Sequence, residues 1–277
     1  MKKILLLSLF ILGSCAHKTV VKVVEVPAAA PEVFTTPKTI SEAVNSPFRT
    51  EAFKARDKYR HPVETLTFFG LKPDMTVIEI IPANGWYMEI LAPFLNDHGH
   101  YIMAIPEGPN MDSPNSAIGN WSKKHFQIAK NVGIATFDLT NPKAVLGEPN
   151  SVNMVVTFRN VHNWMAKKTE AVAFKSFFKV LKKGGTLGVV EHRAPEDRTD
   201  PLAKTGYVRV SDVIKMAKKA GFRLVAQSEI NANPKDTKDY EKGVWTLPPT
   251  LTLKDQDREK YQAIGESDRM TLKFIKP

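Results

Sequence analysis

The chain has a single cysteine, Cys15, among its 277 residues, so it cannot form an internal disulfide. Its stability must therefore come from a packed core rather than from covalent cross-links. Beyond residue 15 the sequence also lacks any apolar run of the roughly 20 residues that a membrane-spanning helix needs. The apolar run Ile4–Leu12 is too short to span a bilayer. These features exclude a disulfide framework and a bundle of transmembrane helices.

The first 15 residues are typical of a bacterial lipoprotein signal peptide. Lys2 and Lys3 precede the apolar run, and small residues follow it. The ending Leu12-Gly13-Ser14-Cys15 matches a lipobox, which predicts that Cys15 is acylated and becomes the mature N-terminus. An ordinary signal peptide that ends near a cysteine is the alternative. Ala16 is not the Asp that retains such proteins at an inner membrane, so we expect an outer-membrane anchor facing the periplasm.

The next segment, residues 16–41, has the composition of a tether. It is rich in Val, Ala and Pro, and its prolines favour extended backbone. A strand over Val20–Val26 is the alternative. The remainder, residues 42–277, is long enough for one sizeable α/β domain.

The chain carries 39 basic against 29 acidic side chains, a net charge of +10. Such a surplus could favour anionic surfaces. However, the lysines are scattered and no basic run is interleaved with aromatic residues, so nucleic-acid binding is the weaker interpretation. We expect the partners to be the bilayer, through Cys15, and an unidentified small-molecule or envelope acceptor.

Apolar runs alternate with amphipathic stretches along residues 42–277. A helical lead-in over Phe48–Phe69 comes first, broken at His61-Pro62. We then expect strands at Met75–Ile81, Tyr101–Ile105, Ile134–Asp138, Asn153–Phe158, Thr186–Val190, Arg223–Ile230 and Met270–Ile275. Helices are expected at Trp86–Leu95, Trp121–Lys130, Lys168–Leu181 and Val210–Ala220, with a glycine cap over Lys182–Gly185. The alternation predicts a doubly wound, mainly parallel α/β sheet.

The most informative segment is Thr76–Leu91. An apolar β-branched run closes on a carboxylate, turns through Pro-Ala-Asn-Gly and continues as an amphipathic helix. In nucleotide-binding α/β folds, such a strand–loop–helix presents backbone N–H groups and a helix N-terminus to a ligand.

Several motifs together resemble the class I S-adenosylmethionine-dependent methyltransferases, and within them a little-described bacterial family of predicted, often exported, methyltransferases. The resemblance covers Arg49–Pro277. The motifs are Arg56–Pro62, Glu79–Tyr87, Phe158–Trp164, Glu191–Ala194, Gly206-Tyr207, Gly243–Pro249 and Ser267–Met270. The resemblance implies a Rossmann-like sheet of seven strands whose last strand is antiparallel. It also implies S-adenosylmethionine as the cofactor.

The same resemblance implies a set of cofactor-binding residues. Glu79 matches the acid of the first methyltransferase motif, Gly85 the last glycine of its loop, and Asp138 the acid near the adenine amine. Pro82, Ala83 and Trp86 complete the loop. Two departures are visible. Ile81 and Ala83 stand where methyltransferases have glycines, and Glu107 is the nearest replacement for the acid that grips the ribose.

Polar residues follow the fourth and fifth predicted strands. Arg159, Asn160 and His162 lie where methyltransferases place substrate-orienting or basic residues, and His162 could accept a proton near neutral pH. Glu191 and His192 occupy the corresponding place after the next strand. We therefore expect His162, Arg159, Asn160 and His192 to form the catalytic group. A structural role for His162 beside Trp164 is the alternative.

Other candidates keep two interpretations. Asp138 could cap its own turn, Trp86 could pack its helix on the sheet, and Trp245 fits a core position better than a cleft. The two histidines with Asp138 or Glu191 could hold a divalent metal, but their spacing is no metal signature, so we expect no metal.

The preferred function is a lipid-anchored envelope methyltransferase acting on an unknown acceptor. A noncatalytic envelope binding protein on the same fold is the alternative, and a metal-assisted hydrolase is a third. A nicotinamide dehydrogenase is disfavoured, because Pro82-Ala83-Asn84-Gly85 lacks the two early glycines of that fingerprint.

Overall fold

The computed structural model describes residues 34–106 and 116–277. Cys15, Glu107 and most of the predicted tether lie outside these residues. The described part belongs to one compact unit that begins at Phe34, eight residues before the predicted boundary at Glu42. The helix α1 (Ile40–Val44) explains the difference, because it buries Ala43 and Val44 and is capped by the side chain of Thr39. Among the described helices, none is long and apolar enough to cross a membrane.

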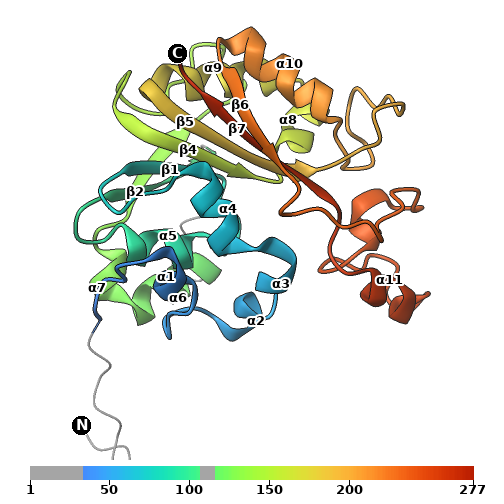
Figure 1. Cartoon of the computed structure of the whole chain (residues 1–277), viewed down its shortest axis with the longest axis horizontal. Helices are drawn as coiled ribbons and strands as arrows, with labels where there is room; N and C mark the ends of the chain where they lie inside the picture. The colour runs from blue at the N-terminus through green and yellow to red at the C-terminus, as the bar shows by residue number, and fades with distance from the viewer. Residues whose placement is uncertain (1–33, 107–115) are drawn as a thin grey trace, which may run out of the picture. The chain divides into compact units, whose positions relative to one another are not determined.

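Helices and strands alternate as the sequence predicts (Figure 1). The strands are β1 (Thr76–Ile80), β2 (His100–Pro106), β3 (Gly133–Phe137), β4 (Val152–Phe158), β5 (Leu181–His192), β6 (Arg223–Ser228) and β7 (Arg269–Ile275). The helices after α1 are α2 (Glu51–Lys54), α3 (Asp57–Arg60), α4 (Pro62–Phe69), α5 (Met88–Phe94), α6 (Ala117–Lys124), α7 (Phe126–Ala129), α8 (Val161–Lys167), α9 (Glu170–Val180), α10 (Val210–Ala220), the 3₁₀ turn η1 (Gly243–Thr246) and α11 (Arg258–Ile264).

The seven strands form one sheet in the order β3-β2-β1-β4-β5-β7-β6. The pairs from β3 to β5 are parallel, whereas β7 runs antiparallel to both β5 and β6. The predicted doubly wound sheet with an antiparallel last strand is confirmed. From β1 the chain moves first to β2 and β3 on one side and then to β4 on the other. Such a reversal leaves a crevice at the carboxyl ends of β1 and β4.

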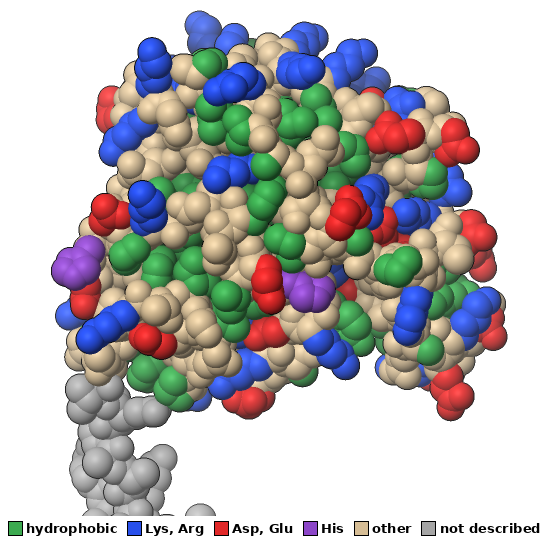
Figure 2. All heavy atoms as spheres, viewed as in Figure 1, with side chains coloured by type: hydrophobic (Ala, Val, Ile, Leu, Met, Phe, Trp, Pro, Cys, Tyr) green, Lys and Arg blue, Asp and Glu red, His purple; other side chains and the backbone are tan. Residues whose placement is uncertain are grey.

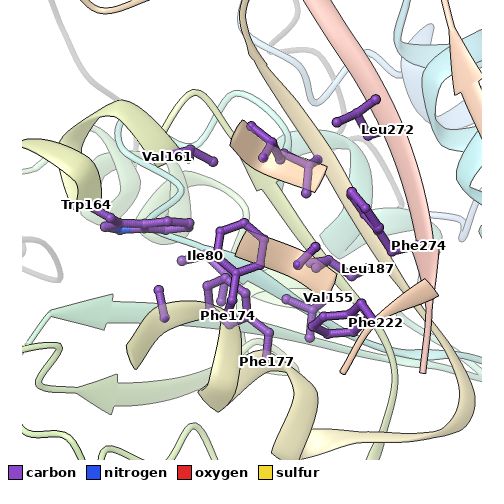
Figure 3. Packing of buried hydrophobic residues seen from close by; sticks show 14 of the residues in the cluster. Ile80, Val155, Val161, Trp164, Phe174, Phe177, Leu187, Phe222, Leu272 and Phe274 are labelled. Carbon is purple, nitrogen blue, oxygen red and sulfur yellow. The ribbon is translucent and has the colours of Figure 1, made fainter. Parts of the chain in front are cut away.

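Two hydrophobic cores cover the two faces of the sheet, because successive strand residues point to opposite sides. Ile78 and Ile80 of β1 face the core under α8, α9 and α10, where Trp164, Phe174 and Phe177 pack (Figure 3). Val77 faces the second core, which includes residues of α1, α4, α5, α6 and α7. Glu79 shares the face of Val77, so its carboxylate enters an apolar layer.

Two sequence predictions were wrong in detail. The predicted helix Trp121–Lys130 is broken at His125, where α6 ends and α7 begins. The predicted helix Lys168–Leu181 corresponds to α9 with slightly shorter bounds, whereas α8 was not predicted. The predicted glycine cap over Lys182–Gly185 is instead the start of β5, and α9 ends at Val180 with Leu181 in extended backbone. On the face shown in Figure 2, lysines and arginines lie among acidic residues, and several of these basic residues lie along its upper edge.

Candidate functional site

A cavity of about 320 Å³ lies at the carboxyl ends of β1, β4 and β5. Eight residues predicted from the sequence line it, namely Glu79, Pro82, Ala83, Trp86, Arg159, Asn160, His162 and His192. Polar and aromatic residues that were not among the predicted site residues also line it, including Arg60, Tyr87, Phe158, Glu266, Ser267 and Arg269. Of these, Arg60 belongs to the lead-in helices, and Glu266, Ser267 and Arg269 belong to the segment that enters β7. The cavity is therefore closed by parts of the chain outside the β1–β5 core.

The loop after β1 keeps a backbone that favours glycine without having the glycines. Ile81 has φ 49° and Ala83 has φ 52°, and only the third such residue, Gly85 at φ 86°, is a glycine. The N–H of Ile81 donates to the carbonyl of Ala104 at 2.8 Å, which ties the loop to β2. Left-handed backbone at a β-branched residue is an outlier that surrounding structure must hold in place. Such strain concentrates at functional sites.

Glu79 is a buried carboxyl at the cavity wall. Glu79 is only 2% exposed, and its Oε2 accepts a hydrogen bond from the Tyr101 hydroxyl at 2.6 Å. Burial raises its pKa to about 7, against the opposing effects of Tyr101 and Arg60. No donor among the described residues reaches Oε1. One oxygen of a carboxyl that ionises near neutral pH thus remains available to a ligand.

His162 and Glu191 form a hydrogen-bonded pair across the ends of β4 and β5. The distance from His162 Nδ1 to Glu191 Oε1 is 3.0 Å. Glu191 is fully buried, and its oxygens also accept the backbone N–H groups of Val161, His162 and His192. Both oxygens are therefore acceptors, so we assign the shared proton to Nδ1 of the imidazole. That tautomer leaves a lone pair on Nε2, which can take a proton.

His192 lies beside His162, with 5.4 Å between the ring centroids. Its Nδ1 is 2.5 Å from the hydroxyl oxygen of Ser267, which also accepts from Nε of Arg269 at 3.4 Å. We assign the serine proton to the contact with Nδ1, which puts the proton of a neutral His192 on Nε2. Burial, with His162 and Arg159 adding to it, lowers the pKa of His192 well below its ordinary value. His192 is thus a neutral donor next to an accepting His162.

Glu266 is the shared carboxylate of three arginines. Arg56 donates to Oε1 at 2.6 Å, while Arg60 and Arg269 donate to Oε2 at 3.3 and 2.5 Å. Burial alone would raise the pKa of Glu266, but Arg269, Arg60 and Arg56 outweigh it and lower the pKa to about 2. The carboxylate is therefore charged at every physiological pH. One negative charge nevertheless offsets three positive ones.

Arg159 adds a fourth guanidinium to this group. It follows β4 with φ 61°, and its N–H donates to the carbonyl of Val190 at 2.7 Å. No acceptor among the described residues lies within hydrogen-bond distance of its guanidinium. Burial, and then the charge of Arg269, lower its pKa to about 10, so it stays cationic at neutral pH.

The remaining predicted residues have structural contacts as well. Asn160 donates to the carbonyl of Ile80 at 2.8 Å, which joins the ends of β1 and β4. Trp86 donates from its indole nitrogen to the carbonyl of Phe53 at 3.0 Å, and Arg60 lies 4.6 Å from its ring centroid. Asn160 and Trp86 therefore stabilise the structure around the cavity through these contacts, and they also line the cavity.

Three residues are placed differently from the prediction. Asp138 does not line the cavity, because its Oδ1 accepts from the N–H and hydroxyl of Thr140 in its own turn. Trp245 is not a core residue but is 37% exposed and lines the cavity, 6.1 Å from the ring of His162. Gly85 is not among the residues that line the cavity, and a Cβ added to it would meet Met88 at 3.0 Å.

The described residues do include one group with metal-ligand chemistry. His162, Glu191 and His192 place one potential ligand atom each within 4.8 Å of one another. The surroundings do not suit a cation. Both oxygens of Glu191 are occupied by N–H donors, and the positive charges of Arg159, Arg269 and Arg60 that disfavour a proton on His192 oppose a metal ion equally. These contacts and charges disfavour a metal ion at the cluster.

Comparison with known proteins gives similarity of structure only. No family model matches the chain, and no curated protein matches its sequence. A SAM-dependent methyltransferase from Aquifex aeolicus aligns with a TM-score of 0.53 at 15% identity, covering 86% of this chain and 98% of that one.

Two further solved structures align over similar lengths. The [4+2]-cyclase SpnF has a TM-score of 0.55 at 15% identity and covers 84% of each chain. Geranyl diphosphate C-methyltransferase from Streptomyces coelicolor A3(2), in complex with Mg²⁺, geranyl diphosphate and S-adenosyl-L-homocysteine, has a TM-score of 0.52 at 12% identity, covering 85% and 87%. Together with the sheet order, these similarities show that the chain has the class I methyltransferase fold.

Proposed function

We propose that this protein is an S-adenosylmethionine-dependent methyltransferase whose active site is the cavity at the ends of β1 and β4. The observation that carries the proposal is a pair of unsatisfied groups there. Glu79 has a free carboxyl oxygen, and Nη2 of Arg60 is buried with no hydrogen-bond partner. Both line the cavity beside the left-handed loop. An acceptor and a donor so placed suit the ammonium and carboxylate of the cofactor's amino-acid end.

The chemistry expected of the chain's own residues follows from the two histidines. When bound, S-adenosylmethionine supplies an electrophilic methyl group on its sulfonium. The acceptor's oxygen or nitrogen would take that methyl group, and Nε2 of His162 would take the proton that the acceptor loses. Glu191 fixes the ring and stabilises its positive charge. His192 would donate a hydrogen bond from Nε2. The cavity walls would hold the reacting atom of the acceptor in line with the methyl group and the sulfur.

Calorimetry with the purified chain tests the cofactor. We expect S-adenosylhomocysteine to bind, and to bind at least about tenfold more weakly to Glu79→Gln, which loses the charge that faces the ammonium. His162→Ala should retain binding but lose turnover by about 10²-fold or more. His98→Ala, an exposed histidine outside the cavity, is the matched control. Absence of any binding of S-adenosylhomocysteine to the unmodified chain would refute the assignment.

One observation favours a second function, a noncatalytic binding protein on the same fold. Ile81 and Ala83 put Cβ atoms into the loop where methyltransferases have glycines, and both line the cavity. A Cβ narrows the approach of a cofactor. The [4+2]-cyclase SpnF, whose structure aligns with this chain, is also named for a reaction other than methylation. Cofactor-dependent product formation that His162→Ala abolishes would exclude this alternative.

We further propose that the protein works in the cell envelope, anchored through Cys15 on the periplasmic side of an outer membrane. The support is the lipobox Leu12-Gly13-Ser14-Cys15 behind a positively charged apolar run. Two or more acyl chains suffice for stable anchoring. Cys15→Ala should move the protein from washed membranes to the soluble fraction. Full retention of that variant in membranes would contradict the anchor.

A further inference from the structure

Positive charge exceeds negative charge on the cavity wall. Arg60, Arg159 and Arg269 line it, against Glu266 and a Glu79 that ionises only near neutral pH. Glu266 is already shared between Arg56, Arg60 and Arg269. A buried cation without a paired anion costs free energy, so a surplus of guanidinium groups at a cavity indicates an anionic ligand.

Arg159 has no hydrogen-bond acceptor for its guanidinium among the described residues. Its backbone is fixed by the N–H bond to Val190 and by a left-handed φ, so its position is set by the sheet rather than by a side-chain partner. The same turn carries His162, three residues later, at the start of α8. An anion bound by Arg159 would therefore hold the rest of its molecule close to the imidazole.

The cofactor does not account for both Nη2 of Arg60 and the guanidinium of Arg159, which have no hydrogen-bond acceptor among the described residues. Its single carboxylate suits Arg60, which belongs to the wall that also carries Glu79 and Trp86. The like charge of Arg159 lowers the pKa of Arg60, and a single carboxylate bound at Arg60 leaves Arg159 without a hydrogen-bonded anion. The second anion must then come from the acceptor.

We propose that the methyl acceptor is a small organic anion whose carboxylate or phosphate forms a bidentate pair with Arg159. This inference rests on the proposed function of the same cavity. The body of the acceptor is apolar or aromatic, because Trp245, Pro248 and Pro249 also line the cavity. The exposed indole of Trp245 stands 6.1 Å from the ring of His162, so an acceptor against it brings its hydroxyl or amine to Nε2.

The test uses benzoate and benzamide as probes, because they share a shape and differ in charge. Calorimetry on the full purified chain should show that benzoate binds and benzamide does not. Arg159→Gln should weaken benzoate at least about tenfold, whereas Arg159→Lys should weaken it less, since lysine keeps the charge without the bidentate geometry. Arg223→Gln, an exposed arginine of β6, is the matched control and should change nothing. Inorganic phosphate in place of benzoate decides between the two anionic groups.

Binding of S-adenosylhomocysteine to the same variants separates the two proposals. If Arg159→Gln keeps that binding and loses benzoate, Arg159 serves the acceptor. If Arg159→Gln loses binding of S-adenosylhomocysteine but still binds benzoate, the inference is overturned. It is also overturned if neither benzoate nor phosphate binds the unmodified chain. If benzoate binds through Arg159 but S-adenosylhomocysteine never binds, the anion site stands and the methyltransferase proposal fails. Thermal melts of each variant confirm that it is folded.

Discussion

At the level of single residues, the loop after β1 holds Ile81 and Ala83 in a left-handed conformation that favours glycine. Each left-handed non-glycine residue costs about 1 kcal/mol or more relative to glycine. The cost is offset by the bond from Ile81 to Ala104 and by packing of the Ile81 side chain on the core under α8 and α9. Ala83 is exposed and gains little from its methyl group.

Ala83→Gly should therefore stabilise the protein, although glycine normally destabilises. Relief of the left-handed strain predicts about 1 kcal/mol, or a rise of roughly 2–4 °C in Tm for a unit of this size. Ala171→Gly, at an exposed position within α9, should lower the stability by about 1 kcal/mol. Thermal unfolding of both variants checks the pair of signs. A fall in Tm for Ala83→Gly would mean that the loop is not strained as described.

Glu79 makes stability depend on pH in an unusual direction. Its folded pKa of about 7 lies above the ordinary value of 4.5, so the folded state holds the proton more tightly than the unfolded chain. The resulting cost is absent below pH 4.5, grows between pH 4.5 and 7, and is complete above pH 7. Glu79→Gln should therefore be more stable than the parent at pH 8, by up to about 3 kcal/mol, and equal to it near pH 4.5. Denaturant unfolding at the two pH values measures this.

At the level of the elements, the contact of α4 with β5 depends on a glycine. A Cβ added to Gly188 would lie 2.7 Å from the ring of Phe69, which is fully buried at the end of α4. Such an approach is too close for two carbon atoms, so either the ring or the strand would have to move.

Gly188→Ala should destabilise the protein by about 1–3 kcal/mol, the usual cost of overpacking a tight core. Phe69→Leu by itself should also destabilise, by leaving a cavity. Combined, the two changes should cost less than the sum of their separate effects, because the smaller side chain makes room for the new methyl group. Denaturant unfolding of the three variants gives the coupling energy, and strict additivity would show that the clash is relieved elsewhere.

The elements themselves were predictable to a large extent. The strand and helix pattern of β1 to β4 follows from apolar periodicity, and α10 has the predicted bounds Val210–Ala220. Helix α8 was not predicted, and it ends at Lys168, whose left-handed conformation carries no glycine signal in the sequence. Similarly, Lys182–Gly185 has the composition of a helix cap, and only pairing within the sheet makes it part of β5.

Only those residues of the candidate site that lie at the end of a predicted strand or shortly after it could be predicted from the sequence. Residues that directly follow strands, such as His162 and His192, could be found because strand ends meet at one edge of a parallel sheet. Arg60 and Glu266 could not, since they are 206 positions apart in the sequence and meet only through the placement of β7. Their charges also gave no signal, because most lysines and arginines of such a chain face solvent.

At the level of the whole molecule, Glu266 joins the two ends of the described chain. It binds Arg56 and Arg60 of the lead-in segment and Arg269 of β7 at once. Removing a buried partner of an ion pair leaves uncompensated charge, which costs more than the pair itself contributes. The net effect of this carboxylate is therefore much larger than that of an exposed acid.

Glu266→Gln should destabilise the protein by about 3–5 kcal/mol at pH 7. Because the folded pKa of about 2 lies below the ordinary 4.5, this stabilisation is complete above pH 4.5 and is lost as the pH falls toward 2. The unmodified chain should thus lose stability steeply in that range, and the variant less so. Glu229→Gln, whose side chain is 72% exposed beside Arg193, should change stability by less than about 1 kcal/mol. Acid titration of unfolding compares the three proteins.

The position of β7 has a consequence for the newly made chain. Arg56 and Arg60 leave the ribosome long before the segment around Glu266, and β7 must then enter between β5 and β6. Until that moment Arg56 and Arg60 lack the counter-charge of Glu266, and one wall of the cavity does not exist. A nascent chain can build the strands of the parallel half-sheet yet has no site to offer a ligand. Ligand binding by this protein therefore reports that β7 has joined the sheet.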